Sequence, residues 1–181
     1  MSVCSNGCGV DLASVRVYID TSVIIPALHP VIESIQRRVG AFFRDVEQGK
    51  YAGIVSDLCR LEYCTYLKEI VATLPSHSGK VTKADIDLGL DKYDQLSEDY
   101  AFEEVSADVL LSEPFIADCM ELVSKSVATQ TKAGEWKFLG CTDCIHAMLA
   151  TRCDAGFLAT MDNHFRGLRD SVQPMVLWDR Y

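Results

Sequence analysis

Short runs of β-branched and aromatic residues alternate with longer helical patterns along this chain, and this alternation restricts the fold more than any other sequence feature. Five runs are predicted to be strands, at 15–19, 53–56, 102–105, 156–160 and 174–178. Helical patterns occupy 31–48, 57–74, 82–96, 114–127 and 142–152, and a short one occupies 163–168. Strands that alternate with helices form a parallel sheet covered on both faces. We therefore expect a doubly wound α/β fold with a mostly parallel, five-stranded sheet.

Two connecting regions and the end of the last strand are predicted from their local residues. The segment after Asp20 opens as a helix or turn and is expected to be broken by Pro26 and Pro30. Residues 128–140 are polar and contain glycine, so we expect a loop there. Trp178 is expected to end the last strand and to pack into the core.

The length of 181 residues suits one domain with an ample core. We expect a flexible N-terminal tail over 1–14 and a single domain over 15–181, with an extra acidic helical segment around 75–101. The helix in that segment begins at Thr82, and Asp85 follows three residues later as in a capping box. No apolar stretch approaches the roughly 20 residues that span a bilayer. No basic residue precedes an apolar run at the N-terminus, so we expect a cytoplasmic protein without a secretory signal.

The cysteines are expected to be reduced, because a chain with a core of this size does not need disulfides and no export signal is present. There are eight of them: Cys4, Cys8, Cys59, Cys64, Cys119, Cys141, Cys144 and Cys153. Cys141 and Cys144 have the spacing of a zinc or redox pair, but a zinc site needs a second pair of ligands, and the four histidines do not supply one at the usual spacing. Small buried apolar side chains are the favoured interpretation.

Negative charge is concentrated in one stretch of a chain whose net charge is −9. Residues 85–121 hold twelve acids and one base, a net charge of −11, whereas the part from Lys125 onward has a net charge of +1. This balance makes non-specific binding to phosphates weak. Two interpretations of the acidic stretch remain open, a docking face for a basic protein and an ordinary solvated helical surface.

Acidic residues follow the predicted strands or begin the neighbouring helices. Asp20 and Asp162 follow strands, Glu62 lies about one and a half turns into a helix, and Asp143 lies in the first turn of another. The carboxyl ends of parallel strands meet at one edge of a sheet, where ligands bind. Two carboxylates about 4 Å apart repel by several kcal/mol at an effective dielectric constant of about 20. Such a cluster should raise the pKa of its members and attract Mg²⁺ or Mn²⁺.

A simpler interpretation is that each acid is a helix cap or a first-turn charge favoured by the helix dipole. We assign Asp57 to that role. Asp20 fits it less well, because it ends an apolar strand and precedes Thr-Ser, and Asp143 fits it less well because apolar and small residues flank it.

Four segments of the sequence resemble, in order and spacing, the motifs of PIN-domain nucleases. They are Tyr-Ile-Asp-Thr-Ser-Val-Ile from Tyr18, the stretch from Val55 to Glu62, the stretch from Thr142 to Ala150, and the stretch from Phe157 to Phe165. The resemblance covers about residues 15 to 178. It implies a PIN-like fold and an Mg²⁺- or Mn²⁺-dependent ribonuclease, commonly the toxin of a toxin–antitoxin pair of the VapC type. Compared with the small toxins of this family, the extra length lies in the N-terminal tail and around residues 75–101.

The resemblance also implies roles for individual residues. The acids of the family fall on Asp20, Glu62, Asp143 and Asp162; the first and third would bind the main ion, and the other two would complete the site, directly or through water. The ion would assist hydrolysis of an RNA phosphodiester by an attacking water. Further substrate contacts are expected from Thr21, Ser22 and Asn163. From their places beside Asp143 and Asp162, four bases either hold the flanking phosphates or are ordinary solvated charges: Lys132, Lys137, Arg166 and Arg169. The expected partners are an RNA substrate and a basic, antitoxin-like protein, and the oligomeric state is left open, with a homodimer compatible.

Two other functions are weighed against the nuclease. A non-catalytic interaction module of the same fold is the alternative, and the complete set of four acids favours the enzyme over it. A phosphatase or phosphotransferase would need a second acid two residues after Asp20, where Ser22 stands.

His146 lies three residues after Asp143 and faces nearly the same way, so it either touches substrate or, as we favour, is a buried and hydrogen-bonded histidine. Trp136 either stacks on a base or anchors its loop.

Overall fold

The sheet is five-stranded and entirely parallel, as predicted. The structure, a computed structural model, describes residues 14–29, 32–73, 81–106, 108, 113–126, 128–130, 134, 136–168 and 172–180. The strands stand in the order β3-β2-β1-β6-β7, and each neighbouring pair is parallel. Their bounds are β1 Val15–Ile19, β2 Tyr51–Ser56, β3 Glu103–Val105, β6 Phe157–Thr160 and β7 Gln173–Val176.

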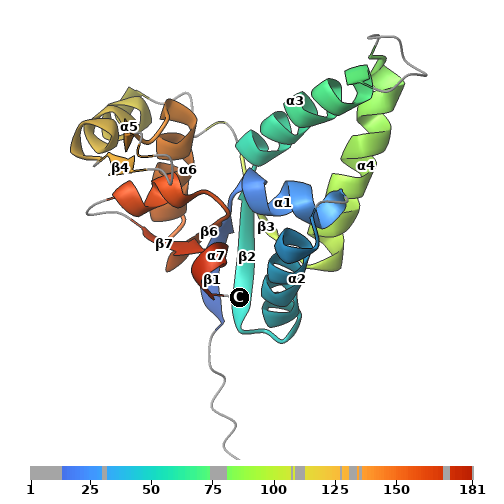
Figure 1. Ribbon diagram of the computed structural model, residues 1–181, viewed down its shortest axis with the longest axis horizontal. Helices are drawn as coiled ribbons and strands as arrows, with labels where there is room; N and C mark the ends of the chain where they lie inside the picture. The colour runs from blue at the N-terminus through green and yellow to red at the C-terminus, as the bar shows by residue number, and fades with distance from the viewer. Residues whose placement is uncertain are drawn as a thin grey trace, which may run out of the picture.

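Helices cover both faces of this sheet, and the path of the chain explains which helix covers which face. The helices are α1 Thr21–Leu28, α2 Glu33–Glu47, α3 Asp57–Thr73, α4 Lys83–Asp99, α5 Glu113–Lys125, α6 Cys141–Arg152, α7 Leu177–Arg180 and the 3₁₀ helix η2 Asn163–Gly167. Helices α1 to α4 lie on one side of the sheet, and α5 and α6 lie on the other (Figure 1). The chain crosses from β1 through β2 to β3, and then returns past β1 to β6. Because parallel crossovers are right-handed, this reversal places α5 and α6 on the opposite face.

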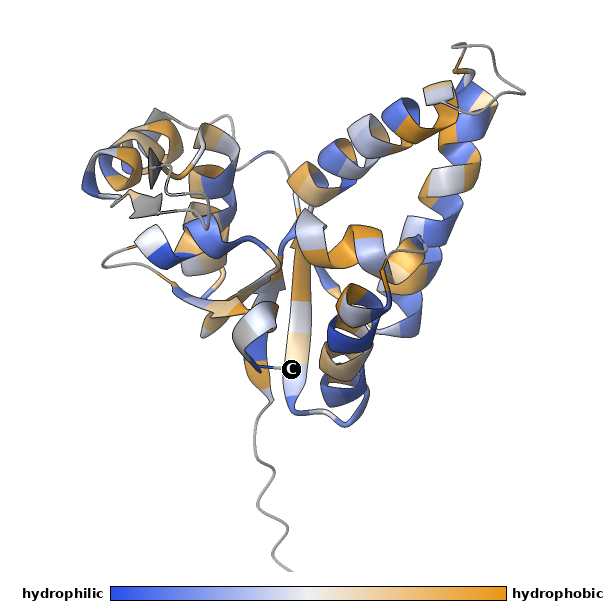
Figure 2. Cartoon of the chain, viewed as in Figure 1, coloured by the Kyte–Doolittle hydropathy of each residue, from blue (hydrophilic) through white to orange (hydrophobic). Residues whose placement is uncertain are grey.

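The core lies along the central strands. Val17, Tyr18 and Ile19 of β1 are fully buried, as are Leu158 and Ala159 of β6. Strands that are covered on both faces are apolar without alternation, and each fully buried large aliphatic side chain contributes about 1.5–3 kcal/mol. Figure 2 shows orange and blue bands alternating along α2, α3 and α4, the pattern of helices with one face on the core and one in solvent.

Three local predictions were wrong. The 128–140 region holds a small antiparallel hairpin of β4 Thr129–Gln130 and β5 Trp136–Lys137, because strands of two residues are too short to show an alternating pattern. Trp178 lies in α7 rather than at the end of a strand, since β7 ends at Val176. Pro26 lies inside α1 and does not break it, and Pro30 lies outside the described residues. Pro26 removes one backbone hydrogen bond, and burial of neighbouring residues of α1 in the core holds the helix together.

The extra acidic helical segment is formed largely by α4. Its predicted start is confirmed: Asp85 N–H donates to Thr82 Oγ1 at 3.3 Å, and Thr82 N–H donates to Asp85 Oδ2 at 2.9 Å. Residues 74–80 and the predicted tail, except Ser14, lie outside the described residues. Several acids of the 85–121 stretch are neutralised by ion pairs: Asp87 with Lys83, Asp94 with Arg60, Glu103 with Arg16, Asp118 with Arg152 and Glu121 with Lys125. The acidic surface is therefore weaker than its sequence charge suggests.

No helix in the described part of the chain is long and apolar enough to cross a membrane.

Candidate metal centre

The four predicted acids line one pocket at the carboxyl ends of the strands. This pocket has a volume of about 340 Å³, and its lining comprises Asp20, Thr21, Ser22, Ile25, Glu62, Thr65, Asp143 and Asp162. Asp20 directly follows β1, and Asp162 comes two residues after β6. Between β1 and β6 the strand order reverses direction, and the crevice at such a point is where α/β sheets bind ligands.

Asp20 is buried, with 5% of its surface exposed. Its backbone N–H continues the β1–β6 ladder by donating to Ala159 O at 3.0 Å. Its Oδ2 accepts hydrogen bonds from Ser22 Oγ and, at 2.8 Å, from Thr160 Oγ1. Its side chain makes no hydrogen bond that caps α1. Asp20 stands at the N-cap position of α1, but its carboxylate is oriented by these hydroxyls and not by backbone N–H groups of the helix.

Thr160 and Ser22 also connect the two strand ends. Asp162 N–H donates to Thr160 Oγ1 at 2.9 Å, and Met161 N–H donates to Ser22 Oγ at 3.0 Å. The turn after β6 is thus tied to the first turn of α1, which places Asp162 on the same pocket as Asp20. Ser22, predicted to contact substrate, has this structural role and also lines the pocket.

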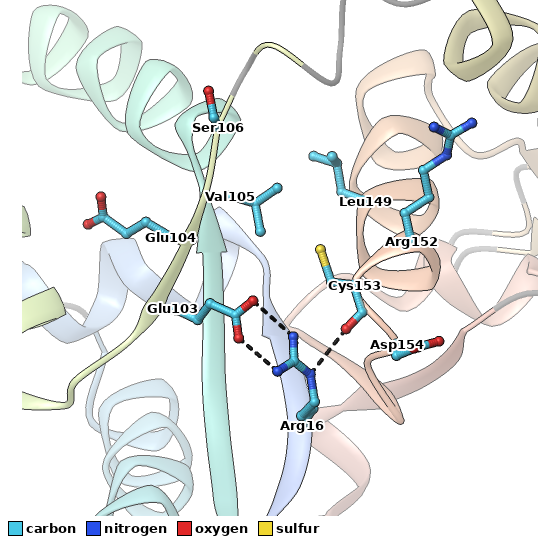
Figure 3. Close-up of a pocket in the computed structure, with 9 residues that line it drawn as sticks. All are labelled: Arg16, Glu103, Glu104, Val105, Ser106, Leu149, Arg152, Cys153 and Asp154. Atoms are coloured by element: carbon cyan, nitrogen blue, oxygen red, sulfur yellow. Dashed lines mark hydrogen bonds and ion pairs between the residues drawn. The ribbon is translucent and has the colours of Figure 1, made fainter.

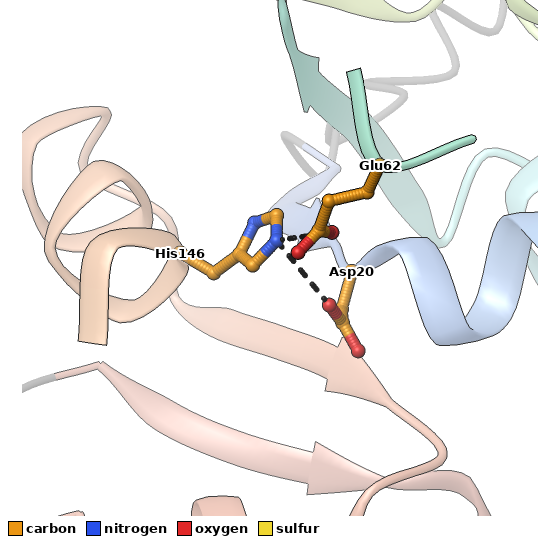
Figure 4. A group of neighbouring side chains, drawn as sticks. All are labelled: Asp20, Glu62 and His146. Atoms are coloured by element: carbon orange, nitrogen blue, oxygen red, sulfur yellow. Dashed lines mark hydrogen bonds and ion pairs between the residues drawn. The ribbon is translucent and has the colours of Figure 1, made fainter. Parts of the chain in front are cut away.

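Glu62 reaches the pocket from α3, and its side chain is 31% exposed. Thr21 Oγ1 donates to Glu62 Oε2 at 2.5 Å, so this hydroxyl orients an acid of the pocket that it also lines. His146 Nε2 lies 2.8 Å from the same Glu62 oxygen and 3.7 Å from Asp20 Oδ1 (Figure 4). Among the described residues, Asp20, Glu62 and His146 each offer one ligand atom, and all three atoms lie within 4.8 Å of one another. These side chains fit a divalent cation.

His146 is the residue whose role the sequence underestimated. It is 1% exposed and fully hydrogen-bonded, as favoured, because its Nδ1 lies 2.9 Å from Tyr18 Oη. Yet its Nε2 faces the acids. The sequence signal was its spacing of three residues from Asp143 on α6, which places both side chains on nearly one side of the helix.

Asp143 and Asp162 line the pocket and also begin local helices. Asp143 Oδ2 accepts a hydrogen bond from Gly140 N–H at 2.9 Å at the start of α6. Asp162 Oδ1 accepts one from His164 N–H at 2.7 Å at the start of η2. The capping role and the pocket role therefore coexist in these two residues. Asp57, assigned to capping alone, is exposed in the first turn of α3 and does not belong to the pocket lining.

The charges of the pocket do not all act in the predicted direction. Burial raises the pKa of Asp143 above its ordinary value, and the charges of Asp162 and Asp20 add to this shift. Burial also opposes ionisation of Glu62, but the hydrogen bond and charge of His146 outweigh it, so the pKa of Glu62 is lowered. The expectation that crowding raises the pKa of the acids thus holds for Asp143 and is wrong for Glu62. Burial alone would lower the pKa of His146, whereas Cys59, Glu62 and Asp20 raise it well above its ordinary value.

Three of the remaining predicted substrate contacts belong to the described residues. Asn163 and Arg166 are exposed on η2, and Lys137 is exposed on β5. None of the three lines the pocket. Lys132 and Arg169 lie outside the described residues, and so do Cys4 and Cys8. The six described cysteines are free thiols, as expected of a reduced protein.

A second, larger cavity of about 810 Å³ lies between β3 and the end of α6 (Figure 3). Its central cation is Arg16, which forms ion pairs with both carboxylate oxygens of Glu103, at 2.8 and 3.0 Å. Arg16 Nε also donates to Cys153 O at 3.1 Å. The guanidinium is therefore engaged within the protein, and this cavity gathers no comparable set of ligand atoms among its described residues.

Comparison with known proteins establishes the fold. No family model matches the sequence, and no curated protein matches it. The chain is similar in structure to a chain in the crystal structure of VapBC2 from Rickettsia felis bound to a DNA fragment from their promoter. The two chains are 15% identical, with a TM-score of 0.54, over 88% of this chain and 97% of that chain. At this identity the likeness shows a shared α/β fold.

Proposed function

We propose that this chain is a divalent-metal-dependent ribonuclease of the PIN-domain family that hydrolyses RNA phosphodiester bonds. The observation that carries the proposal is the convergence of four carboxylates, Asp20, Glu62, Asp143 and Asp162, on one pocket where the strand order reverses. Asp20 directly follows β1 and Glu62 lies on α3, whereas Asp143 on α6 and Asp162 after β6 come from the C-terminal part of the chain. A structural role does not require four acids to share one cavity, because their mutual repulsion opposes it.

Asp20 and Asp143 would hold the ion directly, and Glu62 and Asp162 would complete the site directly or through water. When bound, Mg²⁺ or Mn²⁺ polarises a phosphoryl oxygen and lowers the pKa of a water molecule. The chain itself supplies the orientation of the acids. Ser22 and Thr160 fix the carboxylate of Asp20, as the hydrogen bonds above describe. Loss of such a supporting contact typically costs about 10- to 100-fold in metal affinity or activity.

Single-stranded RNA is the proposed substrate, because a splayed strand can reach an open sheet edge more easily than a duplex can. Lys137 and Arg166 are exposed and lie on elements that flank the strand ends. Together with Asn163, Lys132 and Arg169 they are proposed to hold the phosphates on either side of the scissile bond.

The protein is further proposed to be the toxin of a VapC-type toxin–antitoxin pair, which the fold likeness to a VapBC2 chain supports. A groove of about 350 Å³ between α1 and α4 fits a basic partner with apolar anchors. Leu28, Leu88 and Leu96 give it an apolar lining. Asp91 and Asp99 add negative charge, which Lys92 in the same lining partly offsets. Charge complementarity mainly speeds encounter, so association should slow as ionic strength rises. An association rate that ignores salt contradicts this site.

The function is tested by RNA cleavage with and without Mn²⁺ or Mg²⁺. Asp20→Asn and Asp143→Asn should each lower the rate at least about a hundredfold, because loss of a ligand disrupts the position of the ion. Asp57→Asn is the matched control, since Asp57 also begins a helix but lies outside the pocket, and it should cleave at the wild-type rate. Equal cleavage by wild type and both site variants would refute the proposal, and an inert protein that binds a partner would favour the interaction module.

A further inference from the structure

A buried nitrogen atom stands among the carboxylates of the proposed site. His146 Nε2 lies 2.8 Å from Glu62 Oε2 and 3.7 Å from Asp20 Oδ1, while the side chain is 1% exposed. Two ligands at right angles, each about 2.1 Å from one ion, lie about 3 Å apart. The separation of His146 Nε2 and Glu62 Oε2 thus already matches that of two ligands of a single ion.

The other ring nitrogen of His146 is held by a buried hydrogen-bonded chain. Nδ1 lies 2.9 Å from Tyr18 Oη, and Tyr18 Oη lies 2.6 Å from Ser56 Oγ. A tyrosine hydroxyl accepts one hydrogen bond and donates another. Tyr18 can therefore accept from Nδ1–H and donate to Ser56. An ion that displaces the proton between Nε2 and Glu62 then meets the lone pair of Nε2. Histidine ligands of metals are almost always supported in this way through their second nitrogen.

We propose that His146 is a nitrogen ligand of the ion, that Tyr18 and Ser56 are its positioning residues, and that the site selects transition-metal dications such as Mn²⁺ over Mg²⁺. This inference rests on the proposed function and specifies its ion. Mg²⁺ is bound through oxygen atoms in near-ideal octahedral geometry. Imidazole suits iron, nickel, copper and zinc best, and Mn²⁺, which shares the preference of Mg²⁺ for carboxylates, also accepts nitrogen as a first-row transition metal. A site of carboxylates alone would accept either ion. A fixed imidazole adds a donor that Mg²⁺ uses poorly.

Pulsed electron paramagnetic resonance of the Mn²⁺-loaded protein tests the inference, because a coordinated imidazole couples its ¹⁴N nucleus to the electron spin of the ion. The wild type should show this coupling, and His146→Gln should lose it. His164→Gln is the matched control. His164 Nδ1 lies 3.0 Å from Asp162 Oδ1, so His164 is the other histidine beside a pocket acid, and its replacement should leave the coupling intact.

Calorimetric titration gives an independent measurement. The wild type should bind Mn²⁺ at least tenfold more tightly than Mg²⁺, and His146→Gln should lose most of that preference by weakening Mn²⁺ alone. Tyr18→Phe should keep the nitrogen coupling but weaken Mn²⁺ binding about tenfold, the lower end of the effect of such supporting contacts.

The outcomes distinguish failure of this inference from failure of the proposed function on which it rests. If wild-type protein binds Mn²⁺ without nitrogen coupling, His146 is not a ligand and the inference fails, while the metal-dependent nuclease stands. If neither ion binds, both fail. The wild-type spectrum decides the matter even if His146→Gln does not fold, and coupling that vanishes in His164→Gln would also overturn the assignment.

Discussion

Replacing Asp143 by Asn should stabilise the metal-free protein. Asp143 is partly buried beside the charges of Asp162 and Asp20, and its raised pKa shows that the fold disfavours its ionised form. The hydrogen bond from Gly140 N–H lowers the pKa of Asp143, but burial outweighs it, so the net shift of this pKa is upward. Asparagine keeps the shape of the side chain and an oxygen that accepts the same bond.

The magnitude follows from the link between pKa and stability. Each unit by which a folded-state pKa exceeds its unfolded value is worth about 1.4 kcal/mol at neutral pH. Partial exposure of Asp143 reduces this effect, so we expect a gain of about 1 kcal/mol at pH 7, within the range of stabilising substitutions at functional sites. For a chain of this length that is about 2–4 °C in Tm. The gain should shrink as pH falls through the raised folded-state pKa and vanish below the unfolded pKa of 3.8, where Asp143 is protonated in both states.

Thermal melting in a chelator and in millimolar Mn²⁺ measures this effect. Metal should raise the Tm of the wild type through mass action and raise that of Asp143→Asn much less. Asp57→Asn serves as control: it removes a first-turn charge of α3 outside the pocket, so it should be neutral or destabilise by up to about 1 kcal/mol. If Asp143→Asn melts below the wild type in chelator, and metal shifts both equally, the acids do not form one site.

Three further predictions concern the surroundings of the site. Because the pKa of His146 is raised above 6.5, its contribution to the stability of the metal-free protein is complete below pH 6.5 and is lost as pH rises through the folded value. Tm in chelator should therefore fall as pH rises above 6.5, and His146→Gln should flatten that fall, whereas parallel curves would contradict the prediction. Thr160→Val removes a hydroxyl that donates to Asp20 and should weaken Mn²⁺ binding about 10- to 100-fold in calorimetry; unchanged affinity would show that Asp20 needs no such support. Gly53→Ala places a Cβ 2.5 Å from a ring atom of Phe102, so it should cost about 1–3 kcal/mol in denaturant unfolding, and a neutral result would mean that the ring moves freely.

The fold was predictable because alternating strands and helices have few ways to pack. Once the strands are parallel and the crossovers right-handed, the acids that follow β1 and β6 must share an edge of the sheet. The hairpin of β4 and β5 was missed because it rests on pairing between two-residue strands, which leaves no periodic trace in the sequence. The place of Pro26 inside α1 was missed for a related reason: burial of the helix decides its stability, and local propensity does not reveal burial.

The meeting of the four acids at one pocket was predicted from the sequence, but the lowered pKa of Glu62 was not. Counting carboxylates predicts repulsion throughout the pocket. The structure adds His146, which lies against Glu62 and lowers the pKa of that acid. Its importance depends on the hydrogen bond to Tyr18, a residue 128 positions away. Contacts between β1 and α6 appear only when the chain is folded, so the sequence could name the histidine without assigning its partner.

Two residues on one side of α6 should therefore affect metal-free stability in opposite directions. Asp143 faces other acids, and its neutralisation should stabilise the fold. His146 lies between Glu62 and Asp20, so His146→Gln leaves two carboxylates without their cation. Loss of one partner from a fully buried ion pair costs about 3–5 kcal/mol, and the partial exposure of Glu62 makes the lower end the expected loss. The double variant should recover part of that loss, because removal of the Asp143 charge lowers the repulsion on the carboxylate of Asp20. Denaturant unfolding of the wild type, both single variants and the double variant in chelator measures this coupling. Strictly additive changes would show that His146 and Asp143 do not act on the same carboxylates, and that the pocket is not one electrostatic unit.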